Sequence, residues 1–408
     1  MHIYLNIILT ISLFLASCLS NFDIIDKGIS LINNPTKAIA NSILSQMTLE
    51  EKIGQMFMVD ADSLDNKRNL TVLTENSKEL LAKYKLGGVI FFKNNIVSIN
   101  QTQKLISDLQ DNSKIPLFIS VDEEGGKVSR IASNLNMHAT VLPNSNIIGN
   151  TKKSKNAYLI GQILGKEISS LGFNMNFAPV ADINTNPKNP VIGVRSYGND
   201  EKLVAEMVYN CIVGMQDQNV SSVIKHFPGH GDTATDTHKG TVIIKHDIER
   251  LRSIEFIPFK KGIQAGVDGI MIAHIKVPNV TNEEIEASLS KEVVTNILRN
   301  ELGYKGLIIT DALNMCAIAN VYGTKKVCVK AVLAGVDILL MPIPFEEGYN
   351  EVLKSAKSGI ITEEKINESV IRILETKIKR KLFEKTQKNP EKELGSQQNV
   401  EILKSILE

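Results

Sequence analysis

The chain has 408 residues, of which 43% are hydrophobic, and this composition is sufficient for a large buried core. Its formal net charge is only +1, so the sequence offers no electrostatic field for a nucleic acid or another polyanion. Tryptophan does not occur and aromatic residues make up 5%, which argues against a single-strand binder or a long open glycan groove and favours a small substrate bound in a pocket.

The first 18 residues are largely apolar and contain no Lys, Arg, Asp or Glu. This stretch is too short and too close to the N-terminus for a typical membrane span, and it is typical of an export signal. It ends in Leu15, Ala16, Ser17 and Cys18, which resembles the bacterial lipoprotein signal, where a small residue precedes a lipidated cysteine. We therefore expect residues 1–18 to be a signal and the protein to be exported and anchored by a lipid on Cys18 to a membrane of the cell envelope. An ordinary cleaved signal or an uncleaved anchor is the alternative.

Residues 19–43 show mixed polarity without a sustained period and are expected to form a tether. Thr48 and Glu51 then have the spacing of a capping box, which predicts a helix in the segment MTLEEKIGQMF. We expect a single folded domain over residues 44–384, a monomer, and a charged tail over residues 385–408 that is mobile or forms a peripheral helix.

Eight short runs rich in β-branched and aliphatic residues recur within that domain. The runs, each with the number of its first residue, are FMV at 57, GGVIFF at 87, PLFISVD at 116, FNMNFAPVAD at 173, SSVIKHF at 221, GIMIAHI at 269, GLIITDA at 306 and DILLMP at 337. Most are continuous hydrophobic runs, as strands buried on both faces require, and segments with helical spacing separate them. This alternation predicts the α/β class and a single (β/α)8 barrel of the TIM type, with the active site at the C-terminal ends of the strands. A doubly wound open sheet is the alternative, but no G-x-G-x-x-G follows the first strand, and the count of eight favours closure.

Polar residues directly follow these runs, where a barrel of this type gathers its active site. Asp311 comes straight after GLIIT, so its carboxylate is expected to project from a rigid strand end into the barrel mouth, as a nucleophile requires. By position alone, an aspartate that caps the next helix is an equal alternative.

Asp236 and His238 lie two residues apart in a loop rich in Gly, Thr and Asp. In an extended backbone both side chains can face the same way, and a carboxylate beside an imidazole raises its proton affinity and fixes its tautomer. Such a pair can donate a proton near neutral pH and later accept one from water. A solvated loop with a chance D-x-H spacing is the alternative.

A set of charged residues near the strand ends is suited to binding neutral hydroxyl groups and an acyl oxygen, with a buried ion-pair network as the alternative. The set consists of Asp122, Arg130, Arg195, Lys225 and His226.

His226 and His230 also suggest a metal site, but Pro228 and Gly229 between them prevent the helical spacing that zinc hydrolases use. The three cysteines beyond residue 18 have no C-x-x-C spacing, which argues against a disulfide framework or a cysteine metal site. We expect neither a metal nor a cofactor.

Four segments carry a longer pattern. They are KHFPGHGDTATDTH at 225–238, VDEEGGKVSR at 121–130, RSYG at 195–198 and SLSKEVVTNILRNELGYKGLIITDALNM at 288–315. The first is long and highly specific, and together they resemble the family 3 glycoside hydrolases, in particular their bacterial β-N-acetylglucosaminidase branch. The resemblance covers residues 47–383, which is nearly the whole expected domain.

This resemblance implies a retaining, exo-acting hydrolase that removes terminal β-linked N-acetylglucosamine from murein fragments or short glycans. Asp311 would attack the anomeric carbon, while His238, assisted by Asp236, would protonate the leaving oxygen and then activate water. The positions that hold the sugar in the family match Asp122, Arg130, Arg195, Lys225 and His226.

Two other functions are compatible with the residues. A glycoside phosphorylase would use phosphate instead of water, and a histidine acid/base suits it because a second carboxylate would repel the incoming phosphate. A surface lipoprotein that only binds sugar would be expected to lack Asp311 or His238, and both are present.

Overall fold

The computed structural model describes residues 34–408 with the exception of 66–68, 234–239, 241 and 385–387. Cys18, Asp236 and His238, which the sequence singles out, lie outside the described residues. Within the described part of the chain, no helix combines the length and the apolar character that crossing a bilayer requires.

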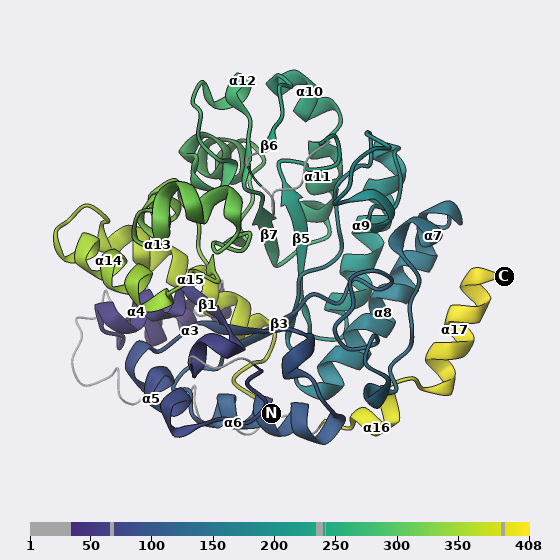
Figure 1. Cartoon of the computed structure of the whole chain (residues 1–408), viewed down its shortest axis with the longest axis horizontal. Helices are drawn as coiled ribbons and strands as arrows, with labels where there is room; N and C mark the ends of the chain where they lie inside the picture. Colours follow the sequence, from purple (N-terminus) through teal and green to yellow (C-terminus); the bar gives the residue numbers. More distant parts are fainter. Residues whose placement is uncertain (1–33, 66–68, 234–239, 241, 385–387) are drawn as a thin grey trace.

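Eight parallel strands form one barrel sheet at the centre of the molecule (Figure 1). They are hydrogen-bonded in the order β10, β1, β2, β3, β4, β5, β7, β9, and a parallel bridge between Ile309 and Ile338 joins the two ends of this series. The predicted (β/α)8 barrel is therefore confirmed, each predicted run contains one strand, and the open-sheet alternative is wrong. The strands are β1 (Phe57–Asp60), β2 (Gly88–Phe91), β3 (Phe118–Val121), β4 (Met175–Asn176), β5 (Ser221–Phe227), β7 (Gly269–Ile272), β9 (Leu307–Thr310) and β10 (Leu339–Leu340).

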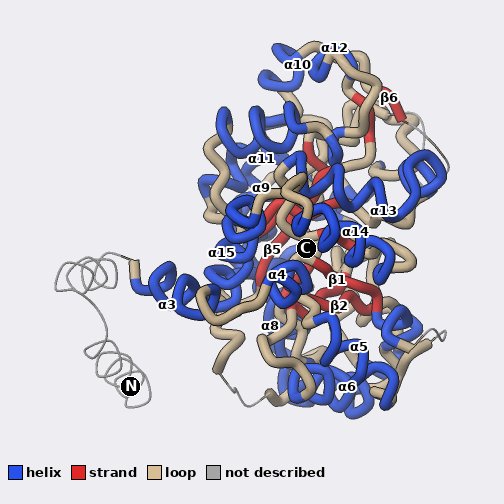
Figure 2. The backbone as a smooth tube through the Cα atoms, turned by 90° about the vertical axis from the view of Figure 1, so that its left-hand side faces the viewer, coloured by secondary structure: helices blue, strands red, loops and turns tan. Residues whose placement is uncertain are grey.

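Helices alternate with these strands and surround the barrel (Figure 2). The helices are α3 (Pro35–Leu44), α4 (Leu49–Gln55), α5 (Glu75–Tyr84), α6 (Ile99–Asp111), α7 (Ser145–Asn150), α8 (Ser154–Leu171), α9 (Glu201–Gln216), α10 (Ile248–Ser253), α11 (Phe256–Gln264), α12 (Pro278–Thr281), α13 (Cys316–Ala334), α14 (Phe345–Lys357), α15 (Glu363–Lys379), α16 (Pro390–Glu393) and α17 (Gln397–Leu407). Short 3-10 segments are η1 (Ala61–Leu64), η2 (Lys93–Asn95), η3 (Leu135–Met137), η4 (Gly193–Arg195) and η5 (Ala287–Leu289), and η6 (Glu292–Glu301) is a π-helix. A separate parallel pair consists of β6 (Val242–Ile243) and β8 (Ile275–Lys276).

The barrel strands are buried on both faces. Every residue of β1, β2, β3, β5, β7 and β9 is buried, because one face points into the barrel and the other packs against helices. This is why the sequence shows continuous apolar runs there instead of alternation.

Two of the outer helices pack with their backbones unusually close together. A Cβ atom on Gly161 of α8 would lie 2.3 Å from the carbonyl oxygen of Cys211 in α9. In the same way, a Cβ atom on Gly214 of α9 would lie 2.1 Å from the carbonyl oxygen of Tyr158. The absence of side chains at these two positions is what allows α8 and α9 to approach each other.

The helix predicted from the capping box is α4. The Glu51 amide donates to Thr48 Oγ1 at 3.2 Å, and the Thr48 amide donates to the Glu51 carboxylate at 3.1 Å. The prediction is confirmed down to its two reciprocal hydrogen bonds.

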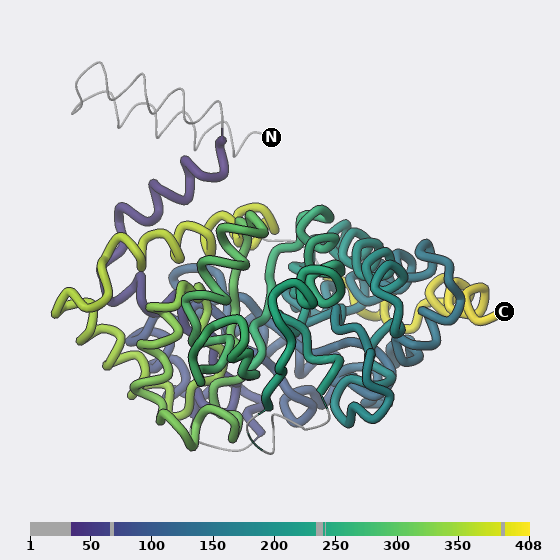
Figure 3. The backbone as a smooth tube through the Cα atoms, turned by 90° about the horizontal axis from the view of Figure 1, so that it is seen from above, coloured from purple at the N-terminus to yellow at the C-terminus, as the bar shows by residue number. Residues whose placement is uncertain are grey.

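The expected tether over residues 19–43 extends too far toward the C-terminus. Residues from Pro35 form α3, whose first turn is capped by the Asn34 side chain. Ala40 and Leu44 are buried, and α3 packs along α15 (Figure 3). This contact stabilises a helix where the sequence was expected to form a tether, so the folded body begins by Asn34.

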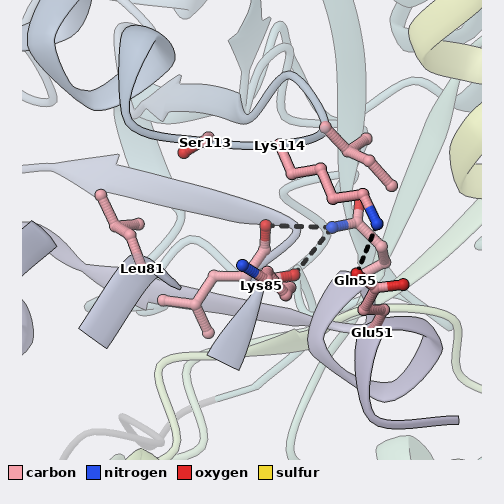
Figure 4. Close-up of a pocket in the computed structure, with 8 residues that line it drawn as sticks. Glu51, Gln55, Leu81, Lys85, Ser113 and Lys114 are labelled. Atoms are coloured by element: carbon pink, nitrogen blue, oxygen red, sulfur yellow. Dashed lines mark hydrogen bonds and ion pairs between the residues drawn. The ribbon is translucent and has the colours of Figure 1, made fainter. Parts of the chain in front are cut away.

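Helix α15 crosses the N-terminal end of the barrel. Its buried Lys377 donates from Nζ to Gln55 Oε1 at 2.7 Å and to the Gly87 carbonyl at 2.9 Å, just before β1 and β2. Gln55 also donates to the Lys85 carbonyl at 2.8 Å, beside a hollow of about 10 Å³ that offers room for little more than one water molecule (Figure 4). This end of the barrel is therefore closed.

The described part of the C-terminal tail packs against the outside of α8 (Figure 1). The buried carboxylate of Glu167 in α8 accepts hydrogen bonds from the Gly395 amide and from Asn399 Nδ2, each at 3.0 Å. The same carboxylate accepts from the amide and the hydroxyl group of Thr140. Residues 388–408 thus form a peripheral helical segment with a buried polar attachment.

Candidate active site

A pocket of about 320 Å³ opens at the C-terminal ends of the barrel strands. It contains all six predicted site residues that the structure describes, which are Asp122, Arg130, Arg195, Lys225, His226 and Asp311. Charged residues from β3, β4 and β5 and their loops form one wall. The rest of the lining is mostly apolar and consists of Ile90, Phe92, Val128, Phe177, Val191, Met271, Ala312, Met315, Leu340 and Met341, with Glu124, His230 and Asn314 completing it.

The charged wall is built around Glu124. Arg195 binds its carboxylate through two parallel hydrogen bonds, from Nε at 2.9 Å and from Nη2 at 2.8 Å. Lys225 Nζ lies 2.7 Å from Glu124 and 2.7 Å from Asp122. Burial alone would raise the pKa of Glu124, but the charges of Lys225 and Arg195 outweigh burial and lower it to about 2.

Lys225 remains charged in this network although it is almost fully buried. Burial acts to lower its pKa, but the carboxylates of Asp122 and Glu124 outweigh burial and raise the pKa above its ordinary value. The expected alternative of a buried ion-pair network is thus correct for Glu124, Arg195 and Lys225, and these residues also line the pocket.

An irregularity in β5 brings two consecutive side chains to the pocket. The pairing register between β5 and β7 shifts between Ile224 and Phe227. Side chains of a regular strand alternate between faces, and such a bulge changes that alternation locally. Lys225 and His226 therefore both line the pocket.

Asp182 holds the two histidines of the pocket. His226 Nδ1 lies 2.7 Å from Asp182 Oδ2, and the His230 amide donates to Asp182 Oδ1 at 2.7 Å. Burial would raise the pKa of Asp182, but His226 outweighs it and lowers the pKa, so the carboxylate stays ionised. An ionised carboxylate only accepts hydrogen bonds, which places a proton on His226 Nδ1 and fixes the orientation of its ring.

Asp311 lies immediately after β9 and lines the pocket. Its amide donates to the Ile272 carbonyl at 2.9 Å, and its Oδ1 accepts from the Ala312 amide at 2.8 Å. Burial would raise the pKa of Asp311, but His226, His274 and the Ala312 amide outweigh it and lower the pKa. The next helix, α13, has Met315 at its N-cap, so the helix-cap interpretation of Asp311 is wrong.

His274 supports the backbone next to Asp311. Its Nε2 lies 3.1 Å from the Ala312 carbonyl oxygen, and its Nδ1 lies 2.8 Å from Ser288 Oγ. Because a carbonyl oxygen can only accept, Nε2 carries the proton. Burial lowers the pKa of His274 below its ordinary value, although the nearby Asp311 carboxylate acts in the opposite direction.

Arg130 also belongs to the charged wall, but its guanidinium makes only weak contacts with the protein. Its Nη2 is 3.9 Å from Asp122 Oδ2, and the guanidinium lies over the Phe92 ring at 5.8 Å. Among the described residues, its buried Nε has no hydrogen-bond partner. The side chain is 27% exposed and lines the pocket, so its guanidinium can bind a ligand oxygen.

The proposed proton-transfer pair, Asp236 and His238, lies outside the described residues. Next to that segment in the sequence, Asp232 accepts from Thr185 Oγ1 at 2.9 Å and lies 2.6 Å from His246 Nε2. Asp232 therefore faces His246, whereas His226 faces Asp182 and His230 Nδ1 lies 2.8 Å from Thr233 Oγ1.

The sequence did not assign Glu124 or Asp182 to the site, and it considered His230 only as a ligand of a metal site that was not expected. Glu124 follows Asp122 by two residues after β3, and this spacing on one side of an extended chain is the signal that could have identified it. Asp182 is a polar residue at a strand end, but its role depends on His226, which is 44 residues away.

Comparisons with known proteins agree with this geometry. Residues 48–376 match the glycosyl hydrolase family 3 N terminal domain. A "Beta-hexosaminidase A" from Pseudoalteromonas piscicida is 33% identical over 380 residues, which cover 84% of this chain and 63% of the relative. The chain thus spans less than two thirds of that relative's length.

Two solved structures are similar over most of the chain. A glycoside hydrolase family 3 β-N-acetylglucosaminidase from Paenibacillus sp. str. FPU-7 has a TM-score of 0.82 and 37% identity, covering 88% of this chain and 68% of its own. A β-glucoside phosphorylase has a TM-score of 0.80 and 25% identity, covering 91% of this chain and 66% of its own.

Proposed function

Because the chain belongs to glycosyl hydrolase family 3, we propose that it is a retaining, exo-acting β-N-acetylglucosaminidase acting on murein fragments or short glycans. The observation that carries this proposal is the ionised Asp311 at the end of β9, inside a pocket whose other wall presents charged hydrogen-bonding groups. The similarity to named β-hexosaminidases supports the choice of sugar.

In the first step, the Asp311 carboxylate attacks the anomeric carbon and forms a glycosyl ester. The bond between that carbon and the leaving oxygen breaks, and His238 donates a proton to this oxygen. In the second step, His238 takes a proton from water while the water oxygen attacks the same carbon, and the ester bond to Asp311 breaks. Asp236 assists by stabilising the protonated imidazole.

The environment of Asp311 suits both steps. Its lowered pKa keeps the carboxylate ionised at neutral pH, as a nucleophile requires, and also makes it a competent leaving group. The Ala312 amide occupies Oδ1, so Oδ2 is the oxygen that we assign to the attack.

The charged wall binds the sugar hydroxyl groups. Lys225, Arg130 and His226 carry donors for hydroxyl and acetamido oxygens, and Asp122 accepts from a hydroxyl group. Arg195 contacts the pocket as well, but its two hydrogen bonds to Glu124 make it chiefly the support of that carboxylate. A pocket of about 320 Å³ has room for about one sugar residue, which is consistent with action on a chain terminus.

We further propose that the protein is exported and works in the cell envelope as a monomer, anchored by a lipid on Cys18. This part of the proposal rests on the sequence of residues 1–18. Replacing Cys18 by Ala should move the protein from the membrane fraction to the soluble fraction; an unchanged distribution would contradict lipidation.

A β-glycoside phosphorylase is the second candidate, because a β-glucoside phosphorylase has the same fold over 91% of this chain. The imidazole of His238 would not repel an incoming phosphate, whereas a second carboxylate would.

The deciding experiment is turnover of 4-nitrophenyl β-N-acetylglucosaminide by protein without residues 1–18, with and without phosphate. Release of free N-acetylglucosamine at a rate independent of phosphate is the expected result. A phosphate-dependent rate that yields the sugar 1-phosphate would identify a phosphorylase. No turnover in either buffer would favour a protein that only binds sugar.

The role of His238 is tested separately. His238→Ala should still form the glycosyl ester from a substrate with a good leaving group, because little proton donation is needed there. Its breakdown by water should be slow, and an unaffected breakdown rate would contradict the assignment.

A further inference from the structure

Glu123 lies between two acids of the pocket but is itself not part of the lining. Its side chain is buried, and its backbone N–H and C=O groups both form hydrogen bonds with the side chain of Asn176 in β4. The Glu123 amide donates to Asn176 Oδ1 at 2.9 Å, and Asn176 Nδ2 donates to the Glu123 carbonyl at 2.8 Å. The backbone of Glu123 is thus fixed to a strand of the barrel.

The Glu123 carboxylate accepts hydrogen bonds from the loop that follows it. The Arg130 amide donates to Oε2 at 2.7 Å and the Ile131 amide to the same oxygen at 2.8 Å. Ser129 Oγ donates to Oε1 at 2.6 Å, and the Ala132 amide approaches Oε1 at 3.4 Å. Four donors from consecutive residues of the loop converge on this one carboxylate, so it is the main attachment of the loop. Burial outweighs these hydrogen bonds and raises the pKa of Glu123 above its ordinary value.

The loop between these points folds back on itself. Glu124 and Val128 are joined by a backbone hydrogen bond of 2.9 Å from the Glu124 amide, and Gly125 and Val128 form an antiparallel bridge. As a result, the chain passes close to Glu123 again when it reaches Arg130. The Glu123 carboxylate binds the backbone amide of Arg130, while the side chain of Arg130 lines the pocket.

Arg130 has no strong side-chain hydrogen bond of its own to fix it. Its nearest carboxylate oxygen, on Asp122, is 3.9 Å away, and its Nε is without a partner among the described residues. The position of the guanidinium therefore depends on its backbone and on the Phe92 ring beneath it.

We propose that Glu123 is a positioning residue for substrate binding, which acts by holding the backbone of Arg130 so that its guanidinium meets a sugar oxygen without rearrangement. This inference rests on the proposed function, because it assumes that Arg130 binds the sugar. A preorganised donor saves the free energy of ordering a loop at the moment of binding, so its loss appears mainly in substrate affinity.

The test is Glu123→Gln in the full chain. The amide keeps the size of the side chain but has only one accepting oxygen, so it cannot serve the amides of residues 130–132 and Ser129 together. We expect KM for 4-nitrophenyl β-N-acetylglucosaminide to rise about tenfold while kcat changes less than about threefold, a split typical of lost substrate binding. Arg130→Ala should show the same split.

The double variant separates positioning from a general loss of structure. If Glu123 acts through Arg130, then Glu123→Gln combined with Arg130→Ala should raise KM no more than Arg130→Ala alone. Two independent effects would multiply, and a rise of about a hundredfold in the double variant would overturn the proposal.

Glu167→Gln is the matched control, because Glu167 is an equally buried carboxylate with bonds to two backbone amides, a hydroxyl group and an amide side chain. It should lower the thermal midpoint by a similar amount and leave KM unchanged. If Glu123→Gln does not fold, Ser129→Ala removes one of the four bonds and should raise KM about threefold; an unchanged KM in that variant would count against the proposal.

Amide hydrogen exchange gives a readout that does not depend on activity. The amides of Arg130 and Ile131 should exchange at least about tenfold faster in Glu123→Gln than in the wild type, and equal rates would overturn the proposal whatever the kinetics. Absence of turnover in the wild type would instead refute the proposed function, while the exchange result still decides the role of Glu123.

Discussion

Neighbouring protein groups, more than contact with water, keep the carboxylate of Asp311 ionised. It lies among apolar side chains of the pocket, and burial alone would favour the neutral acid. His226, His274 and the Ala312 amide oppose this and keep the pKa below its ordinary value. These three groups come from the ends of the neighbouring strands β5, β7 and β9, so the chemistry of one residue depends on how these strands are assembled.

Asp311→Asn should abolish turnover and leave the fold intact. The amide has nearly the same shape but cannot attack the anomeric carbon, so kcat should fall at least about a thousandfold, equivalent to ~4 kcal/mol. Stopped assays at high enzyme concentration measure this fall, and binding of N-acetylglucosamine measured by calorimetry serves as the control for folding. Turnover above about a tenth of the wild-type rate would show that another group is the nucleophile.

At the scale of residues, the sequence predicts those site residues that can be recognised from their position in the chain without knowledge of their partners. Asp311 and Lys225 are identifiable because each lies at the end of an apolar run, where barrels place their active sites. Glu124 and Asp182 were missed because their roles come from Arg195 and His226, which are 71 and 44 residues away. Such partnerships become visible only when the strands are assembled.

At the scale of elements, strands were easier to predict than the first helix. The barrel strands bury both faces, and this leaves a pattern that can be read locally. Helix α3 was missed, although an asparagine cap precedes a proline at its first position and its apolar residues recur at helical spacing. Its stability comes from α15, more than 300 residues further along the chain, and no local pattern encodes that contact.

Gly161→Ala should destabilise the packing of α8 against α9. A helical glycine usually gains stability on replacement by alanine, but here the new Cβ would lie 2.3 Å from the Cys211 carbonyl oxygen, and a backbone atom cannot move aside alone. We expect a loss of about 2 kcal/mol, measured as a lower thermal midpoint in calorimetry.

Gly262→Ala in α11 is the comparison for this prediction. Its new Cβ would meet Ile224 Cδ1 at 2.6 Å, which is the end of a flexible side chain that can change its rotamer. Its midpoint should fall less than that of Gly161→Ala. The reverse order would show that backbone proximity is not what limits α8 and α9.

At the scale of the whole molecule, the two ends of the barrel differ in chemistry. The C-terminal end carries paired charges around an open pocket, whereas the N-terminal end is sealed by α15 with Lys377 at its centre. The partners of Lys377 are an amide oxygen, a carbonyl oxygen and the Phe118 ring at 5.0 Å, and none of these is a carboxylate. Burial therefore lowers the pKa of Lys377 well below its ordinary value.

Lys377→Met should change how stability depends on pH. Between the lowered pKa of the folded state and the ordinary value of 10.5, the unfolded chain binds a proton at this lysine and the folded chain does not. The free energy of unfolding of the wild type therefore rises with pH in this window, by up to ~1.4 kcal/mol per unit from this group. The variant lacks that contribution.

The measurement compares thermal midpoints at pH 7.5 and 9.5. The wild type should gain stability relative to Lys377→Met as the pH rises, whereas exposed Lys354→Met should follow the wild type. Parallel curves for the wild type and Lys377→Met would mean that the buried lysine keeps its proton.

The position of α3 also determines how a tethered barrel would be oriented. Helix α3 lies along α15 (Figure 3), and α15 contacts the N-terminal end of the barrel through Lys377, so the described chain begins on the side away from the pocket. Residues 19–34, even fully extended, can span at most about 55 Å. An anchor at Cys18 would then hold the barrel close to the membrane, with the pocket facing the aqueous space. Such an enzyme would collect soluble glycan ends that diffuse past the membrane and would have little access to sugars held at the lipid surface itself.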